Sequence, residues 1–419
     1  MKRIELIEKV EGEAKVTYHI SGGEVEFAEI SFFGSRHIES ILKGRPYMDA
    51  LTINPRICGI CGHAHLIATV RALEDCHKDI SIPAKALEIR ETTLSMEMIQ
   101  NHVKWYYLTI LPLLSDEVDY MPALEASRLC AEVISLLAGQ YPHNSYAVEG
   151  GITSRPTPAD IFSALERIER LKKLFITNFV DTEGVSLPSC EKVENILSLE
   201  GTLPTMLRIV FENGWEKLGR SHDRFMVFGE NSLFRRGKST GTRIYGVPDV
   251  KFVEESRVQG SEAGLVRYRD KYYETGPLAR AMMNRTSLVR DAHRRYGDSL
   301  LSRILARVCE IPSLLEYAEE TLMNLDIDSP SFEEPPPFPT EASGMGVVEA
   351  ARGSLIHRIS VENGKISRYD IVTPTQWNLG NGTRDEPSVV QRALKGVDEN
   401  GPLELIFKSF DVCSVCTTH

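Results

Sequence analysis

The protein has 419 residues and a formal net charge of −11, with 48 lysines and arginines against 59 aspartates and glutamates. Its hydrophobic content of 42% and charged content of 26% are typical of a globular protein, which excludes a disordered or collagen-like chain. The most apolar stretch, Trp105–Leu114, is too short to span a membrane, and no long basic run suits nucleic-acid binding.

The first residues do not have the pattern of a signal peptide. Glu5 and Glu8 fall where the apolar core of such a peptide would lie. We therefore expect a cytoplasmic protein. Export carried by a partner subunit would leave no trace in this chain.

The N-terminal region predicts a β-hairpin. Residues Ala14–Ile20 and Glu24–Phe32 alternate apolar and polar side chains, and a Ser-Gly-Gly turn separates them. A second hairpin is expected near the C-terminus, where Gly346–Val361 and Ile366–Val372 flank an Asn-Gly turn.

Between the two hairpins, apolar residues recur at the three- and four-residue spacing of helices. The expected helices are Ala84–Leu111, Ala123–Leu137, Pro158–Phe179 and Leu278–Leu325. We expect the last one to break at Pro312, because an internal proline removes a helical hydrogen bond. A proline-rich stretch, residues 335–339, ends the helical region.

Together these elements predict an α+β fold in which a large helical body carries small β elements near both ends. We expect a single domain over residues 1–419, with a β-rich part at 1–50, the helical body at 51–330, and β elements with the last cysteine motif at 340–419.

The eight cysteines include two Cys-x-x-Cys pairs near opposite ends of the chain, Cys58 with Cys61 and Cys413 with Cys416. This spacing lets both sulfurs of a pair reach one ion, and four thiolates would suit zinc, nickel or iron. A single pair is also compatible with a redox site, half a zinc site or coincidence. The pairs of a zinc ribbon usually lie about 15–20 residues apart. Cys61 and Cys413 are much further apart in the sequence, so a zinc ribbon is disfavoured.

The two motifs resemble those of the large, catalytic subunit of nickel–iron hydrogenases. That family has Arg-x-Cys-Gly-x-Cys followed four residues later by His, which is Arg56–Cys61 with His65 here. Its C-terminal motif, Asp-Pro-Cys-x-x-Cys-x-x-His, is matched by Asp411–His419 except that Val412 replaces proline. Shorter similarities occur in the family's order at Val10–Gly12, Pro142-His143, Gly150-Gly151, Thr275–Arg280, Glu349–Gly353 and Pro374–Asn378.

The resemblance implies that the four cysteines hold a nickel–iron centre. Cys58 and Cys413 would bind nickel terminally, whereas Cys61 and Cys416 would bridge nickel and iron. The iron would carry carbon monoxide and cyanide ligands installed by maturation proteins. His65 would donate a hydrogen bond to a bridging thiolate and so tune its basicity; without the motif it would be an ordinary buried histidine.

The resemblance also implies residues that handle protons and charge. Glu11 matches a glutamate that accepts the proton leaving through a terminal thiolate, such as that of Cys413. Its alternative role is an exposed acid at a strand edge. Arg352 would be a fixed cation above the metals, paired with or oriented by Asp411; an ordinary surface ion pair is the alternative.

The sequence departs from the family pattern at two positions close to these residues. Ala351 stands where the family usually has proline, and Asn101 stands where many members have aspartate. Both departures affect the polar groups around the centre and leave the metal ligands unchanged.

A hard cation, usually magnesium, is implied at the C-terminus. His419 would bind it together with Glu39 and the backbone carbonyl of Ile371. The family precursor continues past this histidine until an endopeptidase cleaves it after metal insertion. We expect either a processed form or a subclass without the extension, as in hydrogen sensors.

The function implied is the reversible heterolytic oxidation of dihydrogen to protons and electrons. The remaining cysteines, Cys76, Cys130, Cys190 and Cys309, lack iron–sulfur spacing, so electrons would leave through the family's iron–sulfur small subunit. One alternative is a hydrogen sensor with low turnover. Another is a zinc-stabilised structural or assembly protein. Respiratory-complex relatives have lost the cysteine ligands and are disfavoured.

Overall fold

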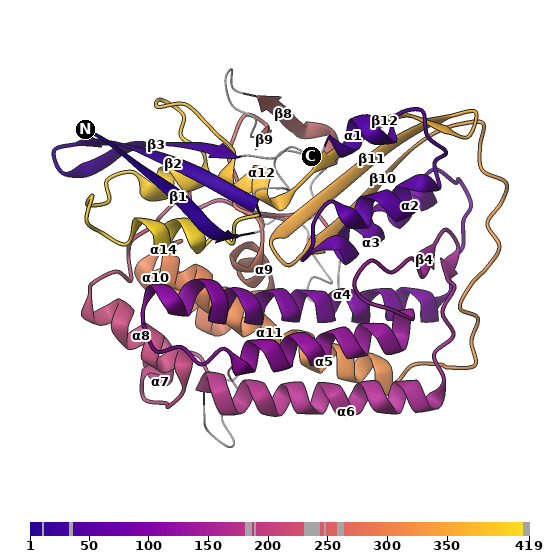
Figure 1. The fold of residues 1–419 in the computed structure, drawn as a ribbon, viewed down its shortest axis with the longest axis horizontal. Coiled ribbons are helices and arrows are strands. Elements are labelled where there is room, and N and C mark those ends of the chain that lie inside the picture. The colour runs from indigo at the N-terminus through magenta and orange to yellow at the C-terminus, as the bar shows by residue number, and fades with distance from the viewer. Residues whose placement is uncertain are drawn as a thin grey trace.

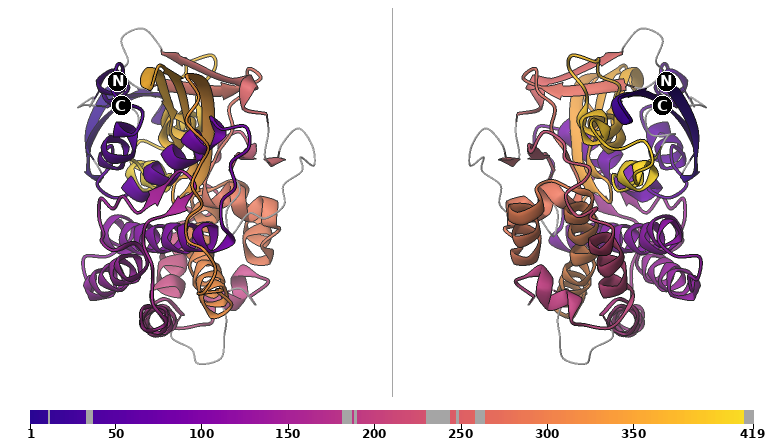
Figure 2. Two further views of the ribbon diagram at one scale, coloured as in Figure 1. Left: turned by 90° about the vertical axis from the view of Figure 1, so that its right-hand side faces the viewer. Right: turned by 90° about the vertical axis from the view of Figure 1, so that its left-hand side faces the viewer.

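In the computed structural model the longest helices form a lower layer, and two three-stranded sheets lie above them together with several shorter helices (Figures 1 and 2). The structure describes the chain except residues 11, 33–36, 181–186, 188–189, 230–243, 247–248, 258–263 and 414–419. For residues 6–10, 12–13, 244–245 and 257 it describes the backbone alone.

The helical layer contains α4 (Ala84–Trp105), α5 (Met121–Ala138), α6 (Pro158–Phe175) and α11 (Leu300–Met323), and α4 and α6 both pack on α5 and α11. Their apolar faces form most of the core. The helix expected at 158 begins there because Thr157 and Asp160 form a reciprocal cap. Three of the expected helices are confirmed, and α4 and α6 continue beyond their α-helical part as π-helical turns over Tyr106–Ile110 and Ile176–Val180.

The expectation of one helix over Leu278–Leu325 with a break at Pro312 is wrong. The region forms α9 (Pro277–Asn284), α10 (Ser287–Tyr296) and α11, and Pro312 lies inside α11. The chain turns instead at Arg285, which has a left-handed φ of 60°, and at Gly297. Burial of α11 on both sides outweighs the one hydrogen bond that proline removes.

The N-terminal sheet has the antiparallel order β1 (Lys2–Val10), β2 (Gly12–Ser21) and β3 (Glu24–Phe32). The predicted hairpin is β2–β3. The third strand, β1, was not predicted from the sequence.

The C-terminal sheet has the order β10 (Glu341–Ala350), β11 (Gly353–Glu362) and β12 (Lys365–Val372). The expected single strand Gly346–Val361 is wrong, because the chain reverses at Ala351-Arg352 and pairs Ala350 with Gly353. Gly353 has a φ of +133°, which a residue with a side chain rarely adopts. The predicted Asn-Gly turn does connect β11 and β12.

Helix α3 (Gly62–Asp75), which the periodicity did not predict, packs closely on β10. A Cβ atom on Gly346 would lie 1.9 Å from the carbonyl oxygen of Ala68, so only glycine permits this approach. The contact fixes the start of α3, and hence the first cysteine motif, beside the β10–β11 turn.

The other elements are short. The helices are α1 (Ile38–Leu42), α2 (Asp49–Ile53), α7 (Val193–Leu197), α8 (Thr202–Glu212), α12 (Pro374–Leu379), α13 (Val389–Leu394) and α14 (Leu403–Lys408). The strands are β4 (Ala147–Val148), β5 (Gly151–Ile152), β6 (Phe225–Val227), β7 (Ile244–Gly246), β8 (Val253–Arg257) and β9 (Gly264–Tyr268). Across the described part of the chain, none of the helices combines the length and apolar character needed to cross a membrane.

Candidate metal centre

Three cysteine thiols from opposite ends of the chain meet in the interior. Cys58 and Cys61 lie in the loop before α3, and Cys413 follows α14. Their sulfur atoms all lie within 4.8 Å of one another, and each residue is buried and free of disulfides. Elsewhere in the described ranges, the structure offers no comparable group of three or more histidine, cysteine or acidic ligands.

The donor set fits a thiolate-bound metal ion. The sulfurs of Cys58 and Cys413 are 3.7 Å apart, far beyond a disulfide bond of about 2.0 Å. Two thiolates about 2.3 Å from one tetrahedral ion are about 3.8 Å apart, which agrees with the observed separation. Buried sulfur ligands without hard oxygen donors favour a soft transition metal. Cys416 lies outside the described residues.

Glu97, on α4, holds the first motif in place. Its two carboxylate oxygens accept the backbone N–H groups of His63 and Ala64 at 2.8 and 2.9 Å, at the start of α3. Burial raises the pKa of Glu97 to about 8, although these two hydrogen bonds act to lower it. The sequence analysis missed this residue, because a glutamate within a helix gives no sign of capping a different helix.

Asn101, one turn further along α4, also contacts the motif. Its amide donates to the carbonyl of Ile60, between the two cysteines, and to the carbonyl of Glu97, both at 2.7 Å. Its oxygen accepts a long hydrogen bond of 3.4 Å from Arg352. The side-chain amide therefore serves both donor and acceptor roles that a carboxylate could not combine.

Arg352 and Asp411 lie together beside the thiols. Arg352 is in the β10–β11 turn, and its Nη2 is 3.2 Å from Asp411 Oδ1. The other oxygen of Asp411 accepts from Arg307 of α11 at 2.7 Å. All three residues are buried, so this is not a surface ion pair. Arg307 was not singled out from the sequence, because a lone arginine in a helix is usually exposed.

Hydrogen bonds between buried side chains connect Arg307 with Arg280. Arg307 donates to His102 Nδ1 at 3.2 Å, and His102 lies 2.8 Å from Glu310, which Arg280 binds with two nitrogens at 2.6 and 2.7 Å. Burial lowers the pKa of His102 to about 4. Burial acts to raise the pKa of Glu310, but Arg280 and His102 hold it at about 2. Arg280 also binds Glu349 at 3.0 Å.

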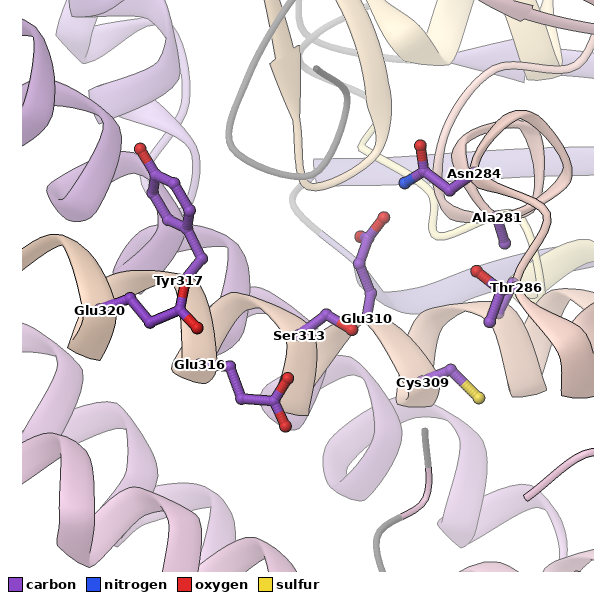
Figure 3. Close-up of a pocket in the computed structure, with 10 residues that line it drawn as sticks. Ala281, Asn284, Thr286, Cys309, Glu310, Ser313, Glu316, Tyr317 and Glu320 are labelled. Carbon is purple, nitrogen blue, oxygen red and sulfur yellow. The ribbon is translucent and has the colours of Figure 1, made fainter. Parts of the chain in front are cut away.

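Glu310 additionally lines a cavity of about 320 Å³ on α11 (Figure 3). Glu316, Tyr317 and Glu320 of the same helix line it, together with Asn284 at the end of α9. The buried charges therefore extend from the thiol site to the wall of an acidic cavity.

A second, more apolar cavity of about 520 Å³ adjoins the thiol site. Ile60, Trp105, Leu108 and Val412 contribute apolar walls, and Arg352 and Asp411 lie at its boundary. A small apolar molecule can therefore approach the charged pair and the cysteine motifs through this space.

Of the remaining residues singled out from the sequence, three lie in the described part of the chain and two lie outside it. Glu39 of α1 accepts the backbone N–H of Ile371 of β12 at 2.8 Å, so these two residues are in contact. His65, in the first turn of α3, is buried and its Nδ1 lies 3.0 Å from His357 Nε2. Glu11 and His419 lie outside the described residues.

Comparison with known proteins accounts for this combination of fold and thiol site. The profile of the family described as nickel-dependent hydrogenase matches residues 36–114 and 264–419, more than half of the chain. The chain belongs to this family. The predicted family is thereby confirmed.

The similarity covers whole large subunits. The periplasmic [NiFeSe] hydrogenase large subunit of Desulfomicrobium baculatum is 26% identical over 99% of this chain and 94% of its own length. The sulfhydrogenase 2 subunit alpha of Pyrococcus furiosus is 28% identical over 98% of this chain and 97% of its own length. The oxidized Ni-Fe-Se hydrogenase from D. vulgaris Hildenborough shares the fold, with a TM-score of 0.85, 23% identity and full coverage of both chains. The predicted α+β class agrees with this architecture.

Proposed function

We propose that the chain is the catalytic large subunit of a hydrogenase that oxidises dihydrogen reversibly to protons and electrons. The observation that carries the proposal is the meeting of Cys58, Cys61 and Cys413 in the interior, beside the buried Arg352–Asp411 pair. Membership of the nickel-dependent hydrogenase family supports it. A thiolate-bound nickel–iron group would supply the redox chemistry that polarises dihydrogen, with carbon monoxide and cyanide on the iron.

The cysteines bind this group through the first and last motifs. Cys58 and Cys413 would be terminal ligands of nickel, and Cys61 and Cys416 would bridge to iron. Arg352 stays charged: burial acts to lower its pKa, but Asp411 and the nearby thiols raise it well above its ordinary value. A fixed cation beside the thiolates offsets part of their negative charge, and Asp411 orients it.

Protons need an acceptor near the thiolates. We assign this role to Glu11, whose Val-Glu-Gly context matches the family's glutamate, with the thiolate of Cys413 as the group that passes the proton on. The assignment rests on the sequence motif. The apolar cavity lined by Ile60 and Trp105 supports entry of an apolar gas toward the thiol site.

A magnesium site formed by Glu39, the Ile371 carbonyl and His419 is the second part of the proposal. The hydrogen bond from the Ile371 N–H to Glu39 supports it, because the N–H and C=O groups of one strand residue point to the same side of the strand. A carboxylate and a carbonyl oxygen are ligands that a hard cation prefers. The cation would then hold the end of the chain against β12.

Electrons require a partner, since the four other cysteines lack iron–sulfur spacing and are all buried: Cys76, Cys130, Cys190 and Cys309. An iron–sulfur small subunit is the proposed acceptor, and large-subunit relatives support a complex of this kind. Maturation proteins would install the metal group, and an endopeptidase would act where the precursor carries an extension. We keep the cytoplasm as the proposed location, although one relative is named as periplasmic.

The test is hydrogen-dependent reduction of an artificial dye by the purified complex. We expect rapid reduction by the wild type, loss of at least 100-fold in Cys413→Ser, and near wild-type rates in Cys130→Ser, a matched buried cysteine on α5. A nickel-containing wild type with very low uptake would instead support a hydrogen sensor. Equal activity of the two serine variants would contradict the proposed site.

A further inference from the structure

Buried polar side chains lead from His65 into the C-terminal sheet. His65 Nδ1 lies 3.0 Å from Nε2 of His357 on β11, and His357 Nδ1 lies 2.8 Å from the hydroxyl of Tyr369 on β12. Thr69 of α3 and Asn54 complete the group, and no member is more than 4% exposed. Buried polar atoms are normally hydrogen-bonded, so the directions of these hydrogen bonds can be argued from the donors and acceptors of the group.

The donor and the acceptor of each hydrogen bond in this group can be assigned by starting from Thr69. The Thr69 hydroxyl lies 2.8 Å from the carbonyl of His65, one turn earlier in the helix, and donates its only hydrogen there. Thr69 therefore accepts from the Asn54 amide at 2.8 Å, and the second hydrogen of that amide goes to the Tyr369 oxygen at 2.7 Å.

The same reasoning assigns the donor and the acceptor in the hydrogen bonds of the two histidines. Tyr369 accepts from Asn54, so its own hydrogen can go to His357 Nδ1 at 2.8 Å or to the Thr69 hydroxyl at 3.3 Å, and the shorter contact favours His357. Burial raises the pKa of the Tyr369 phenol, which keeps that hydrogen in place. A neutral His357 with an acceptor at Nδ1 carries its hydrogen on Nε2 and donates it to His65 Nδ1. A neutral His65 is then left with its hydrogen on Nε2.

We propose that His357 and Tyr369 are positioning residues that hold His65 in its Nε2–H tautomer, so that His65 donates to a thiolate ligand of the metal. The inference rests on the proposed function of the cysteine site. His65 and Cys61 line one small space together with Arg352, which puts the His65 side chain close to the thiol site. Hydrogen bonds to metal-bound sulfur tune the reduction potential, and losing a donor makes the metal harder to reduce.

The experiment compares the nickel reduction potential, read by electron paramagnetic resonance, in the purified complex and in four variants. Tyr369→Phe removes the hydrogen that fixes His357, and His357→Leu removes the donor to His65. His357→Gln restores an N–H close to the position of the imidazole Nε2. His77→Gln is the control, because His77 is buried with Glu149 just beyond the far end of α3.

We expect Tyr369→Phe and His357→Leu to shift the potential to more negative values, with His357→Gln and His77→Gln close to the wild type. Tyr369→Phe keeps the ring and so gives a result even if the leucine variant does not fold. Unchanged potentials in Tyr369→Phe and His357→Leu, or equal shifts in the leucine and glutamine variants, would overturn the inference. Absence of nickel from the wild type would instead overturn the proposed function, and the inference with it.

Discussion

Arg307 binds Asp411 at 2.7 Å and thereby connects the middle of α11 to the residue two positions before Cys413. The other oxygen of Asp411 binds Arg352, so this carboxylate lies between two buried cations. Burial lowers the pKa of Arg307 to about 10, against the attraction of Asp411, and Arg307 remains charged at neutral pH. The start of the last cysteine motif, at Asp411, is thus anchored to the helical layer by charge.

Replacement of Arg307 by methionine tests this anchor. Removing one partner of a buried ion pair leaves the other charge uncompensated, so we expect a loss of about 3–5 kcal/mol in the free energy of unfolding. The surface variant Arg128→Met, whose pair with Glu132 is half exposed, should lose about 0–1 kcal/mol. Urea unfolding measures both. Equal losses would contradict a structural role for the Arg307–Asp411 pair.

Glu97→Gln tests how the first cysteine motif is held. Above about pH 8, where Glu97 is ionised, it offers two acceptor oxygens and glutamine offers one, so the N–H of His63 or of Ala64 loses its partner at a cost of about 1–3 kcal/mol. We expect lower stability and less nickel per purified chain. Glu88→Gln, on the same helix and half-buried, is the matched control and should retain its nickel. Full nickel retention by Glu97→Gln would show that the motif does not need this cap.

The burial of His102 predicts that the free energy of unfolding decreases at acid pH. Its pKa is about 4 in the folded chain against an ordinary 6.5, so below pH 6.5 the unfolded chain binds a proton that the folded chain does not. Stability from this group is therefore lost as the pH falls from about 6.5 to 4. Between pH 7 and 5 the loss is about 2 kcal/mol.

The measurement compares the free energy of unfolding of the wild type and of His102→Gln at pH 7 and pH 5. The variant should lose about 2 kcal/mol less over this interval than the wild type. The exposed His143→Gln should behave like the wild type. An equal pH dependence in wild type and His102→Gln would mean that His102 does not titrate as its burial requires.

Local signals in the sequence predicted elements well where the chain itself supplies the decisive contact. The start of α6 depends on Thr157 and Asp160, three residues apart, and the β11–β12 turn depends on Asn363-Gly364. The two cysteine motifs were recognisable for the same reason, since each occupies only a few consecutive residues.

Features that depend on distant contacts were not predictable. Pro312 remains helical because α11 is packed on α4 and α6, which no local rule records. Glu97, Arg307 and His357 contact the site from separate helices and strands, and nothing in their neighbours along the chain distinguishes them from ordinary core residues. The β10–β11 reversal at Ala351-Arg352 lacks the residues of a common turn, and Arg280 of α9 binds the carbonyls of Ala350 and Ala351 there.

The most direct test of the account is the metal content of the complex purified from its native host. Thiols that converge as Cys58, Cys61 and Cys413 do should retain about one nickel per chain, with iron in excess because of the iron–sulfur partner. The Cys58→Ser complex, prepared identically, should lose the nickel. Zinc in place of nickel in the wild type would contradict the account and favour a structural metal site.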